Sequence, residues 1–424
     1  MSNPPVLLPL GQADLPNQPA SLSRTRVLWL SCVAHALHDG YTDMIYVLLP
    51  VWQSDFGLSY GALAMLRGIY AGTMASLQLP VGRLANWLGS RATLALGTLL
   101  AALGYAMAGW SGSLVGLCVA LALSGSGSST QHPLASGAVA RVYGRNARAP
   151  LSVYNFSGDI GKAALPAALS LLVTLMPWRH ALWIAAAAGC LVAGAIALLL
   201  PAIPRTRPAP QAEPSAASAA QAAAQAAAQG GDSRDTAGPG FRLLLAVGIL
   251  DTAVRMGLLT FLPFLLIQKG ATSPVVGTAL ALVFIGGAAG KFVCGWLGAR
   301  VGVVGTVLST EGGTALLIVA VMFSPLPLAT VLLPLLGLML NGTSSVLYGT
   351  VPELAPSDAT ERAFAIFYTG TIGAGAVAPV IYGFLGDHIG VHGATFATAF
   401  TALAIFPLAI ALRAHLQPDE QPQS

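Results

Sequence analysis

Charged residues are scarce in this sequence. Asp, Glu, Lys and Arg make up only 8% of its 424 residues, whereas hydrophobic residues make up 55%. A soluble domain carries about 25% charged residues, so the composition excludes an ordinary soluble protein. It predicts a polytopic membrane protein instead.

Cysteine is also rare, and its placement excludes two common uses. The four cysteines, Cys32, Cys118, Cys190 and Cys294, lie in apolar runs without a close pair. That spacing suits neither a disulfide framework nor a zinc site. We therefore expect small packing residues, with no resident metal and no cofactor.

Motifs of nucleotide and hydrolase chemistry are missing as well. The sequence has no Walker motif and no glycine-rich nucleotide loop, which argues against an ATP-driven pump within this chain. Ser128, Ser129 and His132 could form a nucleophile and base, but no Gly-x-Ser-x-Gly context supports an enzyme. A membrane-embedded enzyme or a transport-inactive sensor is the rival hypothesis from another class.

Apolar stretches of the length that spans a bilayer as a helix, about 20 residues, recur twelve times. The predicted spans are residues 27–51, 59–82, 92–111, 114–138, 150–174, 181–201, 241–267, 274–297, 304–323, 328–351, 362–386 and 393–414. The expected fold class is therefore all-α, with twelve transmembrane helices in two pseudo-symmetric six-helix bundles.

The domain organisation follows from the composition between the spans. The predicted bundles are residues 27–201 and 241–414, separated by a low-complexity Ala/Gln/Ser linker at 202–240. Residues 1–26 are predicted to be a disordered N-terminal tail, and residues 415–424 a C-terminal tail.

Basic residues predict the orientation of the chain. Of the 20 Lys and Arg residues, fourteen fall on one side of the membrane, whereas only Arg179 and Lys269 fall in loops on the other. The positive-inside rule places both termini and the linker in the cytoplasm, across a bacterial-type inner membrane. The segment that precedes Arg24 lacks the order of a cleavable signal. The net charge of +4 suits lipid headgroups and indicates no nucleic-acid partner.

The two halves repeat one another at a nearly constant offset in sequence. The matching positions are Leu49-Pro50 with Leu262-Pro263, Gly82-x-Leu84 with Gly295-x-Leu297, and Tyr154 and Gly161 with Tyr368 and Gly375. Three matches in order indicate a duplicated six-helix unit.

Two loops carry a family resemblance. GRLANWLGSR, residues 82–91, and CGWLGARVG after the eighth span resemble the G-x-L-x-D-R/K-x-G-R/K-R/K signature of the major facilitator superfamily. The resemblance implies a transporter of two six-helix halves. It also implies a conformational motif formed by Gly82, Asn86, Gly89, Arg91, Gly295 and Arg300. Asn86 and Ala299 stand where the signature has its acid, so the charge latch that the acid forms in that family is expected to be weakened here.

A narrower resemblance lies in the first and fourth spans. HDGYTDMIYVLLPVWQSDFGLS and GSGSSTQHPLASGAVAR are similar to the fosmidomycin-resistance branch of that superfamily. This implies a proton-coupled exporter of small molecules that works with protons and a lipid bilayer, as a monomer. Leu134 stands where the branch has an acid, so the substrate is not carried over.

Six charged residues lie near the middle of predicted spans. They are Asp39, Asp43, Asp159, Lys162, Asp251 and Arg255. Each would cost about 2.5–3.5 kcal/mol at the bilayer centre, so we expect them to face a cavity or one another.

Spacing on the first span predicts a proton-coupling site. His35, Asp39 and Asp43 follow at i, i+4 and i+8 and share one helix face. The span contains acids and titratable imidazoles but no internal cation, which suits proton binding. His38 projects about 100° away from Asp39, so it is either a substrate ligand or a packing histidine.

The remaining buried polar residues predict a substrate site. Asp159 with Lys162 and Asp251 with Arg255 are spaced as ion pairs, either structural or functional. The predicted substrate-binding residues are His38, Gln131, His132, Tyr154, Asn155, Asp159, Lys162, Asp251, Arg255 and Arg67. The buried bases suit a carboxylate, phosphate or phosphonate, whereas Lys291 is expected to snorkel to the membrane surface.

Two other transport hypotheses fit the same residues. One is a proton-coupled importer of an organic anion. The other is a transition-metal transporter that uses His35, His38, Asp39 and His132 as ligands. Gly125, Gly127 and the His132-Pro133 step predict a break in the fourth span that would support alternating access.

Overall fold

The computed structural model describes residues 21–201, 238–355 and 360–416. Within these ranges the chain is helical and contains no strand. The predicted tails and linker lie mostly outside the described residues. Two boundaries differ from the prediction: the first helix begins at Ser21, inside the segment assigned to the N-terminal tail, and another helix begins at Pro239, inside the segment assigned to the linker.

The first half supplies one helix for each predicted span except the fourth. Its elements are α1 (Ser21–Phe56), α2 (Tyr60–Leu88), α3 (Ser90–Trp110), α4 (Leu114–Ser128), α5 (Gln131–Tyr143), η1 (Gly144–Asn146), α6 (Arg148–Leu175) and α7 (Trp178–Leu199). The fourth span is divided between α4 and α5, which confirms the predicted break.

The second half has fewer and longer helices. Its elements are α9 (Pro239–Gln268), α10 (Ser273–Phe323), α11 (Leu326–Leu354), α12 (Thr360–Leu412) and η2 (Arg413–His415). Both α10 and α12 contain two predicted spans, joined at Gly302 with φ 71° and at Gly390 with φ 73°. Glycine tolerates this left-handed conformation, which lets the chain reverse without a loop. All twelve predicted spans therefore correspond to helical segments.

Seven helices in the described ranges are long and apolar enough to cross a membrane by length and composition. They are α3, α6, α7, α9, α10, α11 and the part of α12 from Ile366 onward. α1, which carries two buried histidines and two buried aspartates, is not among them. The predicted all-helical, polytopic fold is confirmed.

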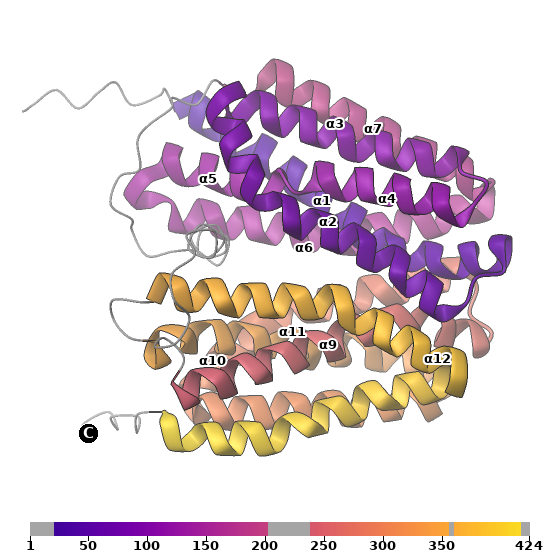
Figure 1. Ribbon diagram of the computed structural model, residues 1–424, viewed down its shortest axis with the longest axis vertical. Helices are drawn as coiled ribbons and strands as arrows, with labels where there is room; N and C mark the ends of the chain where they lie inside the picture. The colour runs from indigo at the N-terminus through magenta and orange to yellow at the C-terminus, as the bar shows by residue number, and fades with distance from the viewer. Residues whose placement is uncertain (1–20, 202–237, 356–359, 417–424) are drawn as a thin grey trace, which may run out of the picture.

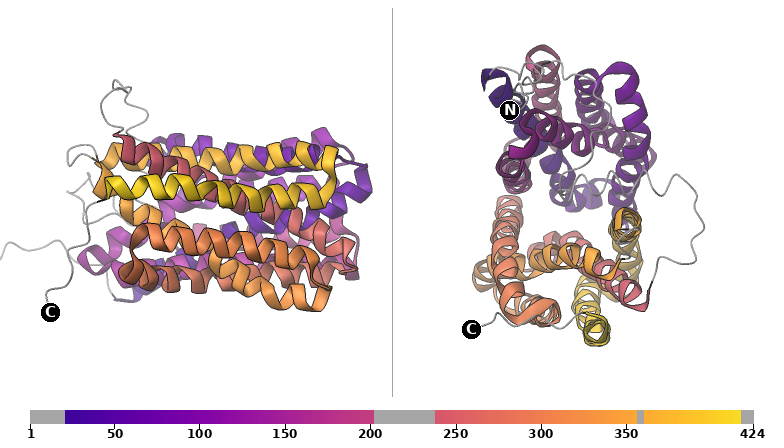
Figure 2. Two further views of the ribbon diagram at one scale, coloured as in Figure 1. Left: turned by 90° about the horizontal axis from the view of Figure 1, so that it is seen from below. Right: turned by 90° about the vertical axis from the view of Figure 1, so that its left-hand side faces the viewer.

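The helices form two bundles that lie side by side. In Figure 1 the indigo-to-magenta helices make the upper bundle and the red-to-yellow helices the lower one. The starts of α1 and α9 and the ends of α7 and α12 lie at one end, which faces the viewer in the right-hand view of Figure 2. We call this end of the molecule the tail end. The opposite end, where the chain turns after α1 and again after α9, is the turn end.

The hydrophobic core is shared at one end and divided at the other. One large cluster contains buried residues from both halves, such as Trp52 and Tyr70 with Phe261. Two smaller clusters at the tail end belong to one half each, around Leu134 in the first and Phe367 in the second. The halves are therefore packed together toward the turn end and separately at the tail end.

A hydrogen-bonded contact between the halves closes the turn end. The Asp387 carboxylate on α12 accepts hydrogen bonds from the backbone N–H groups of Tyr60, at 2.6 Å, and Gly61, at 3.0 Å. Both amides belong to the first turn of α2.

Candidate functional site

Close packing of α6 against α1 positions the site. Gly161 faces the backbone of Ala36, and a Cβ at Gly161 would collide with its carbonyl group. Only glycine allows this approach. The neighbouring Lys162 is thereby brought to the face of α1 that carries Asp39.

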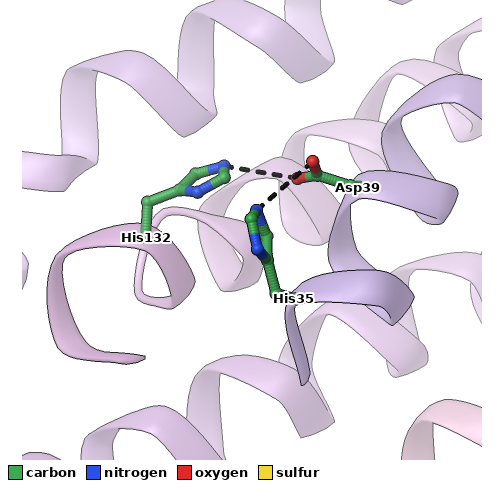
Figure 3. Close-up of side chains that lie close together, drawn as sticks. All are labelled: His35, Asp39 and His132. Carbon is green, nitrogen blue, oxygen red and sulfur yellow. Dashed lines mark ion pairs between the residues drawn. The ribbon is translucent and has the colours of Figure 1, made fainter. Parts of the chain in front are cut away.

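Asp39 is the centre of a cluster built from three helices. Its Oδ2 lies 3.3 Å from His35 Nε2 on α1 and 3.3 Å from Lys162 Nζ on α6. Its Oδ1 lies 3.5 Å from His132 Nε2 on α5. Figure 3 shows both imidazoles turned toward the carboxylate. The sequence predicted the His35–Asp39 spacing, and the fold adds His132 and Lys162.

The orientation of His35 fixes where a proton is needed. Its Nδ1 lies 2.7 Å from the Tyr154 carbonyl oxygen, and its ring stacks on the Tyr154 ring at 4.1 Å. A carbonyl oxygen only accepts, so Nδ1 carries the hydrogen. The contact between Nε2 and Asp39 then requires one more proton, held either by the imidazole or by the carboxyl group.

The break between α4 and α5 brings His132 to this cluster. Pro133 has no N–H to continue the helix, and Ser129 and Thr130 bond back to Gly125 and Gly127 instead. Next to His132, the Gln131 Nε2 donates to the Tyr154 hydroxyl at 3.0 Å. Tyr154 thus contacts His35 through both its ring and its carbonyl oxygen, and Gln131 holds the Tyr154 hydroxyl group.

A row of alternating charges extends the cluster into the other half. Lys162 Nζ lies 3.9 Å from Asp159, which confirms the predicted pair. Asp159 also accepts from Lys291 Nζ of α10 at 2.7 and 2.8 Å. The prediction that Lys291 snorkels is wrong, because its ammonium finds a carboxylate on the facing helix.

His38 lies apart from the Asp39 cluster. It is 2% exposed, with Nδ1 3.1 Å from the Ser128 hydroxyl and Nε2 3.0 Å from the Thr98 hydroxyl. Both ring nitrogens are therefore occupied within the first half. This geometry favours a packing histidine over a substrate ligand.

Asp43 occupies a second charged region near the interface between the halves. It is buried and interacts electrostatically with Lys162, Arg67 and Arg255 without an ion pair within 4 Å among the described residues. Arg67 lies over the Tyr46 ring at 5.3 Å. Buried nitrogens of Arg67 and Arg255 have no hydrogen-bond partner in the described part of the chain. Two cations, one from each half, thus have free donors.

The predicted Asp251–Arg255 pair is not formed within 4 Å in the described ranges. Asp251 instead accepts from the Ser344 hydroxyl at 3.0 Å and is hydrogen bonded to Glu311. Glu311 was missed by the sequence analysis, although it is the single acid within the predicted span 304–323. A lone acid in an apolar span is the sequence signal that could have identified Glu311.

The remaining predicted residues lie outside these clusters. Asn155 and Asn86 are exposed, and neither side chain makes a hydrogen bond to another described residue. In the loop motif, Gly89 has φ 90° and Arg91 donates to the Leu200 carbonyl at 3.4 Å. Its second copy shows Arg300 over the Trp296 ring at 4.2 Å, while Gly82 and Gly295 have open space around them.

The transition-metal hypothesis can be tested against the geometry. Ligand atoms of His35, Asp39 and His132 lie within 4.8 Å of one another. However, the Lys162 ammonium lies 3.3 Å from the same carboxylate. A fixed positive charge at that distance opposes a metal cation, so the donor set fits a proton better.

Two repeated helical bundles with buried charges between them define a polytopic membrane transporter. A sequence model of the Major Facilitator Superfamily matches residues 31–245 and 243–424. The chain belongs to the Major Facilitator Superfamily.

Individual relatives are distant. The Fosmidomycin resistance protein of Escherichia coli (strain K12) is 24% identical over 162 residues, which cover 38% of this chain and 40% of that protein. The match thus spans well under two thirds of the relative's length.

Solved structures share the fold over nearly the whole chain. A bacterial homolog to the human lysosomal transporter Spinster, in an inward-facing and occupied conformation, has a TM-score of 0.76 at 14% identity, covering 94% of this chain and 100% of that one. A mutant of the nucleoside transporter NupG has a TM-score of 0.71 at 14% identity, covering 93% and 100%.

Proposed function

We propose that this protein exports a small organic anion in exchange for protons by alternating access, with Asp39 as the proton carrier. The observation that carries the proposal is the contact between His35 and Asp39. Because His35 Nδ1 is committed to a carbonyl oxygen, one exchangeable proton must lie between Nε2 and the carboxylate.

The free arginine donors support an anionic substrate. Arg67 in the first half and Arg255 in the second both have buried nitrogens without a partner among the described residues. An unpaired buried donor is costly, and a carboxylate, phosphate or phosphonate placed between them would satisfy both. Such a substrate would also link the two halves.

Export is supported by the name of the Escherichia coli relative, since an exporter confers resistance to the compound that it removes. The position of Lys162 favours a second candidate, a proton-coupled importer of an organic anion. A proton on Asp39 releases Lys162, 3.3 Å away, to bind an anion. Proton and anion would then bind together and move in the same direction.

The direction of proton flow distinguishes these candidates. Purified full-length protein is reconstituted into liposomes that contain a pH-sensitive dye, and single anions are added outside. The probes are carboxylates, phosphates and phosphonates, including fosmidomycin. Exchange predicts that the lumen becomes alkaline as the anion enters, whereas cotransport predicts that it becomes acidic.

Two other results would reject both candidate functions, the exchanger and the importer. Uptake of a labelled anion without any pH change would exclude proton coupling. Proton movement driven only by cationic compounds would exclude an anionic substrate. Liposomes carrying the Asp39→Asn variant serve as the control for proton leakage.

The proposal extends to the setting of the protein. We propose that the tail end faces the cytoplasm of an inner membrane, as the basic loops predict. The state with a closed turn end is then open to the cytoplasm. We also propose that the protein works as a monomer and moves its substrate without changing it chemically.

A further inference from the structure

A buried pair of carboxyl groups lies in the second half, away from Asp39. Asp251 on α9 is 3% exposed and Glu311 on α10 is 2% exposed. Asp251 accepts from the Ser344 hydroxyl at 3.0 Å, and Glu311 accepts from the Thr343 hydroxyl at 2.8 Å. Three helices, α9, α10 and α11, therefore enclose the pair.

The contact between the two acids has a chemical requirement. They are bound by adjacent residues of α11, Thr343 and Ser344, and the two carboxyl groups lie within hydrogen-bonding reach of each other. Ionised carboxylates only accept hydrogen bonds, so a bond between two carboxyl groups needs a proton on one of them. Two adjacent buried carboxylates without that proton would repel each other strongly.

The surroundings supply only limited positive charge. The titratable groups that face the pair are Arg255, one turn along α9 from Asp251, and Tyr348 on α11. One shared proton leaves the pair with a single negative charge, which Arg255 balances. A second ionisation would leave an excess negative charge in the membrane interior.

The internal repeat places this pair at a defined position. Asp251 follows His38, and Glu311 follows Thr98, at the same sequence offset at which Leu262-Pro263 follows Leu49-Pro50. His38 is hydrogen bonded to Thr98 at 3.0 Å in the same way that Asp251 is bonded to Glu311. The first half therefore fills this position with an imidazole and a hydroxyl, and the second half fills it with two acids.

We propose that Asp251 and Glu311 form a second proton-binding site, which holds one shared proton in this state of the transporter. The site is separate from the Asp39 cluster and lies in the other half. Loss or gain of its proton changes the charge next to Arg255, one of the two arginines with a free donor. The second half thus has its own link between protonation and the anion-binding arginine.

The test is infrared spectroscopy of the purified full chain, which needs no knowledge of the substrate. The carbonyl stretch of a protonated carboxyl group is compared between neutral and alkaline pH. We expect a band that persists at neutral pH and disappears in both Glu311→Gln and Asp251→Asn. In each variant the new amide donates to the remaining carboxylate, so no proton is needed. Asp159→Asn, which removes a carboxylate bound by two lysines, should leave the band in place.

The outcomes separate the shared proton from its alternatives. Full band intensity in both amide variants would overturn the proposal. Loss in Glu311→Gln with retention in Asp251→Asn would also overturn it, because Glu311 would then be a neutral acid held by Thr343 alone. Failure of the anion proposal would leave this measurement unaffected.

A double variant provides an independent test in case the amide variants fail to fold. Asp251→His combined with Glu311→Thr copies the arrangement of the first half and needs no carboxyl proton. In wild-type protein, alkaline removal of the shared proton should lower the melting temperature. The copied arrangement should abolish that fall, and an equal fall in both proteins would count against the site.

Discussion

Asp39 gathers partners that no single segment of the chain could supply. Its carboxylate contacts His35 from its own helix, His132 from the start of α5 and Lys162 from α6. Each partner stabilises the ionised form, and burial opposes it. In the proposed mechanism, a small change in the distance between Asp39 and any of these partners would shift the proton on or off the carboxylate.

The first prediction concerns the proposed carrier. Asp39→Asn permanently mimics the neutral carboxyl group, so it should still bind the anion and permit exchange between equal pools. It should lose accumulation against a gradient, because no proton is carried. The measurement is uptake into liposomes with and without a pH gradient. Full gradient-driven accumulation by the variant would move the coupling site to Asp43, Asp159 or Asp251.

The second prediction compares two histidines on the same helix. His35→Gln should displace the pH dependence of transport measured from about pH 5 to 8, because we propose that His35 shares a proton with Asp39. His38→Gln is the matched control, since both ring nitrogens of His38 contact hydroxyl groups. Equal pH profiles for wild type and His35→Gln would show that His35 only packs.

At the scale of the helices, interruptions and close contacts place the charges. α4 and α5 are separated at Ser129 and Thr130, where the chain turns His132 toward α1. α6 bridges the halves through Asp159, which binds Lys162 of its own helix and Lys291 of α10. These two helical features connect the proposed proton site to the interface between the halves.

The third prediction tests the break. Pro133→Ala restores a backbone N–H and allows α4 and α5 to join, so the melting temperature should rise. The same change should draw His132 away from Asp39 and slow proton-coupled transport. Pro334→Ala in α11 is the control for loss of an intrahelical proline. Unchanged coupled transport in Pro133→Ala would mean that the break has no role in the site.

The fourth prediction concerns the link between halves. Asp159→Asn leaves the Lys291 ammonium without its carboxylate partner. The single variant should therefore destabilise the protein more than the double variant Asp159→Asn with Lys291→Gln. The Lys291 side chain is 44% exposed, and solvent screening limits the coupling energy to about 1 kcal/mol. Melting temperatures of the four proteins in the double-mutant cycle measure it. Additive effects would indicate that the two residues act independently.

The sequence was sufficient for the fold because hydrophobic length alone marks a membrane helix. Even the spans inside α10 and α12 could be separated, since Gly302 and Gly390 follow a charged or polar turn in each case. The His35–Asp39 contact was predictable for a similar reason, because an i, i+4 spacing defines one helix face.

Contacts between helices were beyond the sequence patterns. No spacing rule indicates that Lys291 on α10 faces Asp159 on α6, or that Glu311 meets Asp251 across two helices. The i, i+4 spacing predicted an ion pair between Asp251 and Arg255 that does not form within 4 Å in the described ranges, because tertiary packing brings Asp251 to Glu311 and Ser344 instead. Pairing within a helix is local, whereas pairing between helices depends on rotation and depth.

At the scale of the whole molecule, the two bundles share a core toward the turn end and have separate cores at the tail end. Separation of the bundles at the turn end would expose apolar surface from the shared cluster. In the proposed alternating access, other surfaces at the tail end would have to come together and offset that exposure.

The fifth prediction concerns the balance between these states. Asp387→Asn removes the charge that holds two backbone amides of α2, so the turn end should open more readily. A loss of about 1 kcal/mol, as expected for a weakened hydrogen bond, changes the ratio of states about fivefold. Labelling of a cysteine placed at Gln53 by an impermeant reagent measures the opening. Asp55→Asn is the control, because Asp55 pairs with Arg179 within one half; equal labelling in both variants would refute the prediction.

The contact at Asp387 also makes α2 depend on the other half of the protein. Its first two amides, at Tyr60 and Gly61, are capped by a carboxylate that α12 supplies, whereas the flanking Ser59 caps the amide of Ala62. When the turn end opens, that turn must fray or bond to water. Hydrogen exchange at these two amides should therefore report the access state directly, in unlabelled protein and without a known substrate.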